Sequence, residues 1–195
     1  MRNSTFFFAG LLLLLVACTQ EPAKNPDPNH THADFAVWIE GKQVDFALSQ
    51  FMSGSSTDLE HKDVLHPYLH LHDGNGRVIH RHKPGQTLQD FMGSLQNMRY
   101  EGTAFKFLDC MTCQRSSGTY TVKLFVNGVE EPQGSAYVFQ DNDKLLITDT
   151  QDPVELRKEI RMVTDDACLY SRTCPERGDP PTENCIADPE VPCTQ

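Results

Sequence analysis

Two short segments, residues 67–72 and 77–83, constrain the fold of this chain more than any other part of its sequence. In both segments histidines recur at every second position, as the strings Tyr-Leu-His-Leu-His and Val-Ile-His-Arg-His show. The intervening string Asp-Gly-Asn-Gly ends at Gly76, which can adopt the left-handed conformation of a three-residue turn. The pattern therefore predicts a β-hairpin over residues 67–83.

The loop length decides which residues of this hairpin face one another. With a three-residue loop at 74–76, the numbers of facing residues sum to 150, so that His70 faces His80. Alternate residues of a strand share a face, so this register places the histidines on one face and the aliphatic residues on the other. A two-residue loop at 74–75 would mix imidazole and aliphatic side chains on both faces, and we therefore favour the first register. The histidines of the shared face are His70, His72, His80 and His82.

This density of imidazole predicts a metal site. Neighbouring imidazoles repel one another when protonated, whereas the neutral ring is a ligand for Zn²⁺, Cu²⁺ or Ni²⁺. A third His-x-His pair, His30 and His32, directly precedes a second predicted hairpin over residues 33–47, which can bring the pair to the same face. Asp34 and Asp73 lie close enough in sequence to orient the rings or to supply oxygen ligands. We expect copper or zinc as the cofactor, with His70, His72, His80 and His82 as the first candidate ligands and His30 and His32 as the second.

The N-terminus has the pattern of an export signal. Arg2 precedes an apolar run, Phe6 to Val16, that is too short to span a bilayer and ends in the string Leu-Val-Ala-Cys. This string resembles a bacterial lipobox. The resemblance implies that residues 1–17 are a lipoprotein signal peptide, that Cys18 is lipidated, and that residues 18–29, which contain three prolines, form an extended tether. Because residue 19 is Thr rather than Asp, the resemblance further implies the outer membrane, with the protein anchored in the bacterial cell envelope and facing the periplasm. An ordinary secretory signal, with Cys18 incidental, is the alternative.

Beyond Cys18 the chain has an even number of cysteines, which in an exported protein predicts up to three disulfides of undetermined pairing. The candidates are Cys110, Cys113, Cys168, Cys174, Cys185 and Cys193. Residues 164–195 combine four of these cysteines with five prolines and are interpreted as a disulfide-stapled tail that cannot build a core.

Two other functions are compatible with the sequence. The histidines can form a polar face that only hydrogen-bonds or meets water, in which case the chain is an interaction module that binds a partner protein in the envelope. Cys110 and Cys113 form a Cys-x-x-Cys motif, a spacing that can lower a thiol pKa, so a thiol-disulfide protein is the second alternative. The loop expected over residues 114–118 lacks the helix of the thioredoxin-like context and favours a structural disulfide.

The remaining pattern predicts an α+β domain over residues 30–163. Thr87 caps a helix whose residues Leu88, Phe91, Met92 and Leu95 form one apolar stripe, and a second helix runs from Asp152 to Val163. Strands are expected over the hairpin segments and over residues 120–126, 136–139 and 144–148. The element order over residues 67–149, together with the strings VNG and DNDKLLI, resembles a β-grasp (ubiquitin-like) fold, specifically the small sulfur carriers, although the Gly-Gly tail of those carriers is missing. The resemblance implies a β-grasp-like sheet with one packed helix, an extra N-terminal β-hairpin and the disulfide-rich tail. The whole set of motifs is also similar to an uncharacterised family of exported His-x-His proteins.

Composition and missing motifs exclude several classes of function. The 17 Lys+Arg against 27 Asp+Glu leave a net charge of −10 and no basic cluster, so nucleic acid is not an expected partner. The chain has no G-x-S-x-G, H-E-x-x-H or P-loop motif. A binding protein is therefore favoured over an enzyme.

Overall fold

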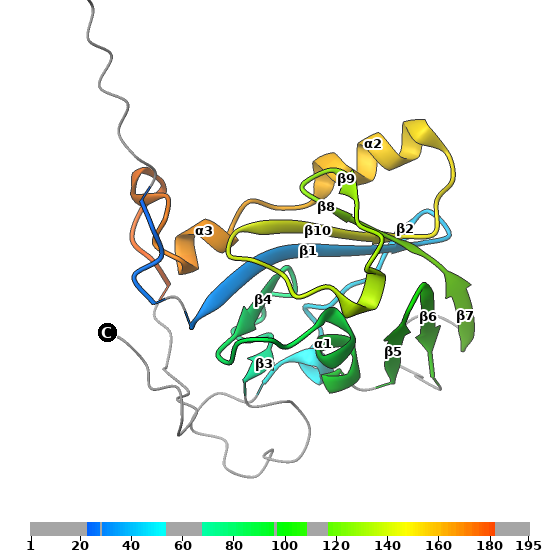
Figure 1. Cartoon of the computed structure of the whole chain (residues 1–195), viewed down its shortest axis with the longest axis horizontal. Helices are drawn as coiled ribbons and strands as arrows, with labels where there is room; N and C mark the ends of the chain where they lie inside the picture. Colours follow the sequence, from blue (N-terminus) through cyan, green and yellow to red (C-terminus); the bar gives the residue numbers. More distant parts are fainter. Residues whose placement is uncertain (1–22, 28, 54–67, 96, 109–116, 182–195) are drawn as a thin grey trace, which may run out of the picture.

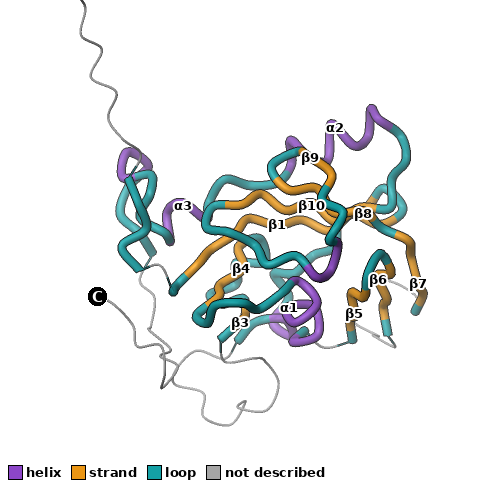
Figure 2. Tube along the Cα trace, in the orientation of Figure 1, coloured by secondary structure: helices purple, strands orange, loops and turns teal. Residues whose placement is uncertain are grey.

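The computed structural model describes residues 23–27, 29–53, 68–95, 97–108 and 117–181. Within these residues the chain forms a mixed α+β structure with two β-sheets and few helices (Figures 1 and 2). The predicted α+β class is confirmed. Several predicted features lie outside the described residues: the predicted signal segment 1–17, Cys18, and the cysteines Cys110, Cys113, Cys185 and Cys193.

The centre of the large sheet is β1 (Thr31–Ile39), in which every residue is buried. It pairs in parallel with β10 (Asp143–Thr148) on one side and antiparallel with β4 (Val78–Arg81) on the other. A strand covered on both faces needs a nearly continuous apolar run, as β1 has between Ala33 and Ile39. The sheet order is β3-β4-β1-β10-β8-β9, with β2 also paired to β1. The other strands of this sheet are β2 (Lys42–Gln43), β3 (Leu69–His70), β8 (Lys123–Val126) and β9 (Val129–Glu130).

The first predicted hairpin forms with the expected two-residue loop. Glu40 and Gly41 have φ values of 52° and 69°, and the Val44 N–H donates to the Val37 carbonyl at 2.9 Å. Its second strand is only two residues long, however, and the main partners of β1 lie elsewhere in the chain. The N-terminal hairpin was expected to be an addition to the sheet, but its first strand is the centre of the sheet. The sequence could not predict this, because the pairing of β1 with β10 joins residues about a hundred positions apart and no local pattern encodes it.

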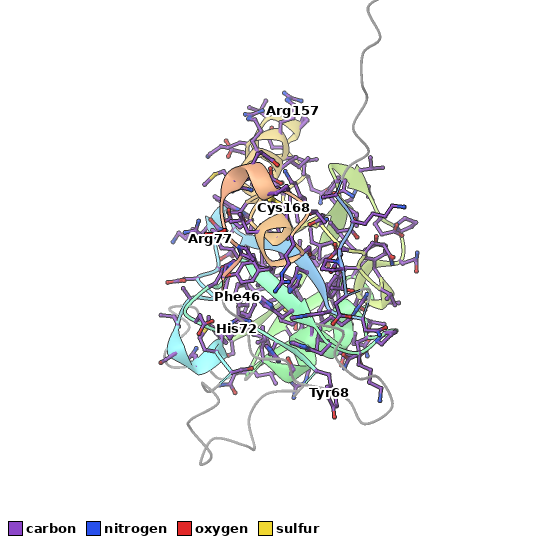
Figure 3. All side chains as sticks on the ribbon, turned by 90° about the vertical axis from the view of Figure 1, so that its left-hand side faces the viewer. Phe46, Tyr68, His72, Arg77, Arg157 and Cys168 are labelled. Carbon is purple, nitrogen blue, oxygen red and sulfur yellow. A yellow bond between two sulfur atoms is a disulfide. The ribbon has the colours of Figure 1, made fainter. Side chains whose placement is uncertain are left out.

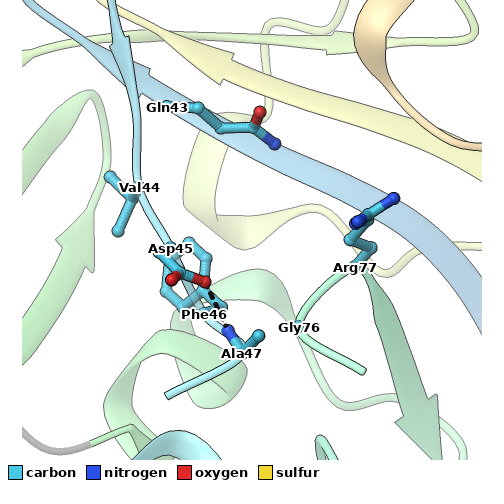
Figure 4. A pocket seen from close by; sticks show the side chains of 7 residues that line it. All are labelled: Gln43, Val44, Asp45, Phe46, Ala47, Gly76 and Arg77. Atoms are coloured by element: carbon cyan, nitrogen blue, oxygen red, sulfur yellow. Dashed lines mark hydrogen bonds between the residues drawn. The ribbon is translucent and has the colours of Figure 1, made fainter. Parts of the chain in front are cut away.

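The second predicted hairpin has the predicted register. Leu69 pairs with Arg81 and His70 with His80, so facing numbers sum to 150. The loop differs in one respect, because the left-handed residues are Asp73 and Gly74, with φ values of 57° and 72°. Glycine is needed at position 76 because there is no room for a side chain, and not because the backbone is left-handed. A Cβ there would overlap the backbone of Phe46 and Ala47, which lie beside Gly76 in Figure 4.

Replacement of Gly76 by alanine is expected to destabilise the protein by about 1–3 kcal/mol, the usual cost of overpacking a closed site. The added methyl group would push the hairpin loop away from the Phe46–Ala47 backbone, and urea unfolding measures the loss. Gly93→Ala is the matched control, because a Cβ at Gly93 meets nothing within 4 Å and alanine favours the helix there. Equal unfolding midpoints for wild type and Gly76→Ala would contradict the packing argument.

The helix expected after Thr87 is α1 (Leu88–Ser94). The Asp90 N–H donates to Thr87 Oγ1 at 3.2 Å and the Thr87 N–H donates to Asp90 Oδ2 at 2.8 Å, which forms a capping box. The apolar stripe of the helix and the aliphatic face of the hairpin belong to one core, as predicted. The members are Leu88, Phe91, Met92 and Leu95 from the helix segment and Leu69, Leu71 and Ile79 from the hairpin.

A second sheet was not expected from the sequence. It contains β5 (Met98–Glu101), β6 (Ala104–Phe107) and β7 (Gly118–Thr121). The strand predicted over 120–126 is divided at Val122, so that β7 belongs to this small sheet and β8 to the large one. The short strand predicted over 136–139 is wrong, since a 3₁₀ turn at Gly134–Ala136 and a loop occupy this region. Further 3₁₀ turns are Ser49–Phe51 and Pro175–Arg177.

Helices cover the opposite face of the large sheet (Figure 1). In α2 (Pro153–Met162), Asp152 Oδ1 accepts from the Val154 N–H at 2.7 Å, so the predicted second helix is confirmed. Its apolar side packs on residues of β1, β8 and β10 that include Trp38 and Leu146. Beyond it lies α3 (Ala167–Tyr170), which contacts β1. None of the helices in the described ranges is long and apolar enough to cross a membrane.

The described part of the C-terminal tail contains the disulfide Cys168–Cys174. This segment also contributes to the core, because Ala167 and Ser171 have no exposed surface. The prolines and cysteines of the tail thus accompany a short helix that is anchored on β1.

Candidate metal centre

Six histidines from three neighbouring strand segments converge on one face of the large sheet. The strand register places His32 of β1 opposite His80 of β4, and His80 opposite His70 of β3. His82 and His72 extend the two hairpin strands at the same parity, and His30 precedes His32 by two residues. The structure therefore brings together all the predicted ligands, including the pair that the sequence ranked second.

The rings form one continuous cluster. The His30 centroid lies 4.3 Å from that of His32 and 4.0 Å from that of His82. The His80 centroid lies 4.9 Å from that of His32 and 3.9 Å from that of His72. Four of the rings are buried and two, His30 and His72, are half-buried. The cluster is thus shielded from water but reaches the surface at two points.

Three of these histidines have the geometry of a metal site. One nitrogen from each of His30, His32 and His80 lies within 4.8 Å of the other two. The Nε2 atoms of His30 and His32 are 3.1 Å apart. Two nitrogens bound at 2.0–2.1 Å to one tetrahedral Zn²⁺ would be about 3.3 Å apart. An ion could therefore be accommodated by small rotations of the rings.

A hydrogen-bond chain orients the His32 ring. Ser171 Oγ lies 2.6 Å from Asp141 Oδ1 and 2.8 Å from His32 Nδ1. Because a carboxylate only accepts, the Ser171 hydroxyl donates to Asp141 and must accept from Nδ1–H of His32. The proton on Nδ1 leaves the Nε2 lone pair of His32 directed toward His30, as a metal ligand requires.

Asp141 also fixes the backbone at the start of the site. Strand β10 begins only at Asp143, so the loop before it supplies the hydrogen-bond partners of the His32 backbone. The His32 N–H donates to Asp141 Oδ1 at 3.1 Å, and the Asn142 N–H donates to the His32 carbonyl at 2.8 Å. Asn25 Nδ2 donates to the same carboxylate oxygen at 3.1 Å and to the His30 carbonyl at 2.7 Å. Asp141, which the sequence did not single out, therefore positions both His30 and His32.

The predicted role of Asp73 is supported by its contact. Its Oδ2 accepts from Nδ1–H of His72 at 2.7 Å. This assigns the lone pair of His72 to Nε2, which lies 3.2 Å from His80 Nδ1. A carboxylate behind a ligating histidine is the usual arrangement in protein metal sites.

Asp34 has a different role from the one predicted. Its carboxylate accepts from Thr164 Oγ1 at 2.6 Å and from the N–H groups of Asp166 and Ala167 at 2.8 and 3.0 Å. Burial raises the pKa of Asp34, while these three hydrogen bonds lower it. Asp34 thus holds the segment that leads into α3 against β1 and orients no histidine.

A buried cation lies behind the cluster. Arg81 alternates with His80 and His82 in the chain, and its guanidinium donates to the Phe139 carbonyl at 2.7 Å and to Thr31 Oγ1 at 3.2 Å. Burial lowers the pKa of Arg81, whereas the negative charges of Asp141 and Asp143 raise it. The arginine therefore ties β4 to the loop that positions His32.

Tyr170 of α3 covers the cluster and could not be identified from its local sequence. Its ring centroid lies 4.8 Å from that of His80 and 5.6 Å from that of His32. Its hydroxyl accepts from Asn75 Nδ2 at 2.9 Å. Figure 3 views this end of the molecule, with His72 labelled and with Cys168, two residues before Tyr170 in the chain, labelled as well. The only sequence signal near Tyr170 is the flanking cysteine pair, which indicates a constrained turn but not its partner.

Comparison with known proteins adds no assignment: no protein-family model matches the chain, and no curated protein or solved structure is significantly similar to it.

Proposed function

We propose that this protein is an extracytoplasmic lipoprotein that binds a transition metal, copper or zinc, through histidines of the large sheet. The observation that carries the proposal is the triad of His30, His32 and His80, whose ligand atoms lie within 4.8 Å of one another. Imidazole nitrogen suits copper and zinc, whereas magnesium and calcium prefer oxygen ligands.

Burial favours this function over a polar interaction surface. Histidines that only met water or a partner protein would be exposed in the isolated chain, but His32 and His80 are 1% and 0% exposed. Removal of several imidazoles from water is costly unless they are bound by partners inside the protein. A shared ion would stabilise such a cluster, and the Ser171–Asp141 chain already orients one ring for it.

Location in the envelope rests on the resemblance of residues 15–18 to a lipobox. The disulfide Cys168–Cys174 supports export, since disulfides persist in oxidising compartments. In this proposal Cys18 anchors the chain in the outer membrane and the histidine cluster faces the periplasm. The site then captures or delivers an ion at the membrane surface.

We further propose that the large sheet is related to the β-grasp fold. The support is its central parallel pair, β1 and β10, flanked by the antiparallel strands β4 and β8, with α1 on one face. In this assignment β1 and β4 take the place of the first antiparallel strand pair of the fold, whereas the sequence suggested the hairpin of residues 67–83 for that place.

Elemental analysis of the mature protein, purified without a histidine tag, tests the metal function. We expect bound copper or zinc in the wild type and a lower metal content in His30→Ala, a change at a half-buried position just before β1 that removes one ligand of the triad. Gln43→Ala, on exposed β2, is the control and should keep its metal. Wild-type protein that binds neither ion when either is supplied would contradict the proposal.

A further inference from the structure

We propose that the histidine cluster binds two ions, the second held between His72 and His80 with His70 as the next imidazole. This inference rests on the proposed function, because both ions belong to the same class of imidazole-seeking metals. The triad of His30, His32 and His80 accounts for only half of the clustered rings.

The first support is a second chelating pair with the same spacing. His72 Nε2 lies 3.2 Å from His80 Nδ1, compared with 3.1 Å between the Nε2 atoms of His30 and His32. Both distances are close to the roughly 3.3 Å between two nitrogens on one tetrahedral Zn²⁺. The cluster thus contains two places where two nitrogens converge.

The second support is that each pair has its own carboxylate. Asp141 acts on His32 through Ser171, and Asp73 acts directly on His72. In both cases the carboxylate directs the proton to Nδ1 and leaves Nε2 for the ion. A single ion at the triad would give the Asp73–His72 contact no role in its coordination.

The third support is access. Each pair combines one buried ring with one half-buried ring: His32 with His30, and His80 with His72. An ion can therefore reach either position from the surface without opening the sheet.

The second position has two converging nitrogens, with a third imidazole beside it. His80 lies at the centre of the face with its Nδ1 toward His72. A neutral imidazole has only one lone pair, so His80 would serve both ions only as a bridging imidazolate, whose remaining ring proton is released to water when the second ion binds. The His70 centroid is 5.7 Å from that of His72 and 6.1 Å from that of His80. Among the described residues only His30, His32 and His80 have three ligand atoms within 4.8 Å of one another, so His70 would join the second position only after its ring turned toward the ion. Two ions would then share the His80 ring.

The number of ions per chain tests the inference. Metal-free protein is incubated with excess ZnCl₂ or CuCl₂, freed of unbound metal by gel filtration, and analysed for metal and protein. Two equivalents of either metal are expected. One equivalent would overturn this inference and leave the proposed function intact, whereas no bound metal would overturn both.

Variants at the second position identify the ligands. The His72→Ala variant is expected to bind one equivalent of metal, with the same affinity that the wild type has for the ion at the triad. Asp73→Asn should weaken one of the two equivalents by about 10–100-fold, the usual effect of removing the partner behind a ligating histidine. Asparagine tolerates the left-handed backbone of Asp73, where φ is 57°.

Asp45→Asn is the control for the lost charge, because Asp45 is exposed and caps only the Ala47 N–H. Two equivalents retained by His72→Ala, or equal weakening of both equivalents by Asp73→Asn, would contradict the assignment. A structural role for Asp73 would lower both affinities together, so the separation of the two equivalents is the decisive readout.

Discussion

Removal of metal with EDTA is expected to lower the thermal unfolding midpoint by about 10 °C. An ion present at a thousand times its dissociation constant stabilises the folded state by about 4 kcal/mol, provided that it does not bind the unfolded chain. For a protein of this size each kcal/mol shifts the midpoint by about 2–4 °C. Differential scanning calorimetry of metal-free and reloaded protein measures the shift.

The physical reason is that folding creates the site. His30 and His32 lie at the start of β1, whereas His80 lies on β4, and only the pairing of these strands brings their rings together. The unfolded chain has no such arrangement, so the free energy of metal binding adds to the free energy of unfolding.

Two controls separate this effect from general ion effects. Excess Mg²⁺ should leave the midpoint unchanged, because it prefers oxygen ligands. The stabilisation by copper or zinc should decrease as the pH falls, because protons compete with the metal for the imidazole nitrogens. Identical midpoints with and without EDTA at neutral pH would contradict a metal-stabilised fold.

Asp34→Ala is expected to destabilise the protein by roughly 3 kcal/mol, since each buried donor left without its acceptor costs about 1–3 kcal/mol. The variant leaves three donors, Thr164 Oγ1 and the N–H groups of Asp166 and Ala167, without their acceptor. Because these donors hold α3 on β1, we also expect weaker metal binding as Tyr170 and Ser171 lose their places. Urea unfolding and a metal titration measure the two effects.

The exposed cap Asp152 provides the matched control. Asp152→Ala also removes an aspartate that accepts from a helix N–H, but on the surface, and should cost only about 1 kcal/mol. Equal destabilisation by both variants would contradict the role assigned to buried Asp34.

The pH dependence of stability gives an independent check on Asp34. Burial raises its folded-state pKa above the usual value of 3.8, so the folded protein binds this proton more tightly than the unfolded chain. The contribution of Asp34 to the free energy of unfolding therefore falls as the pH rises from 3.8 through the folded-state pKa. The Asp34→Asn variant cannot titrate at this position and should lack this part of the pH dependence of the unfolding free energy. An unchanged pH dependence would contradict the raised pKa of Asp34.

The hairpin of residues 68–82 could be predicted in detail because its pattern is local. Histidine and aliphatic side chains alternate with a period of two, and only one register keeps each kind on its own face. His70 therefore pairs with His80 as expected. Thr87 and Asp90 likewise reveal the start of α1 through a capping box three residues apart.

The remainder of the site depends on contacts that leave no periodic signal. Nothing near Asp141, Tyr170 or Ser171 indicates that these residues approach His32, which lies over a hundred positions earlier. Val122 similarly separates β7 from β8, although neither a glycine nor a proline marks the boundary in the sequence. Such contacts are decided by the packing of whole elements.

The amino-acid sequence by itself determined the local geometry: which histidines share a face of the hairpin, where the two main helices begin, and that imidazole is the available ligand. Only the tertiary structure decided that β1 lies between β4 and β10, and that α3 covers the cluster. The physical reason is that alternation and capping act over two to four residues. The pairing of distant strands follows instead from the total apolar surface that the folded chain buries.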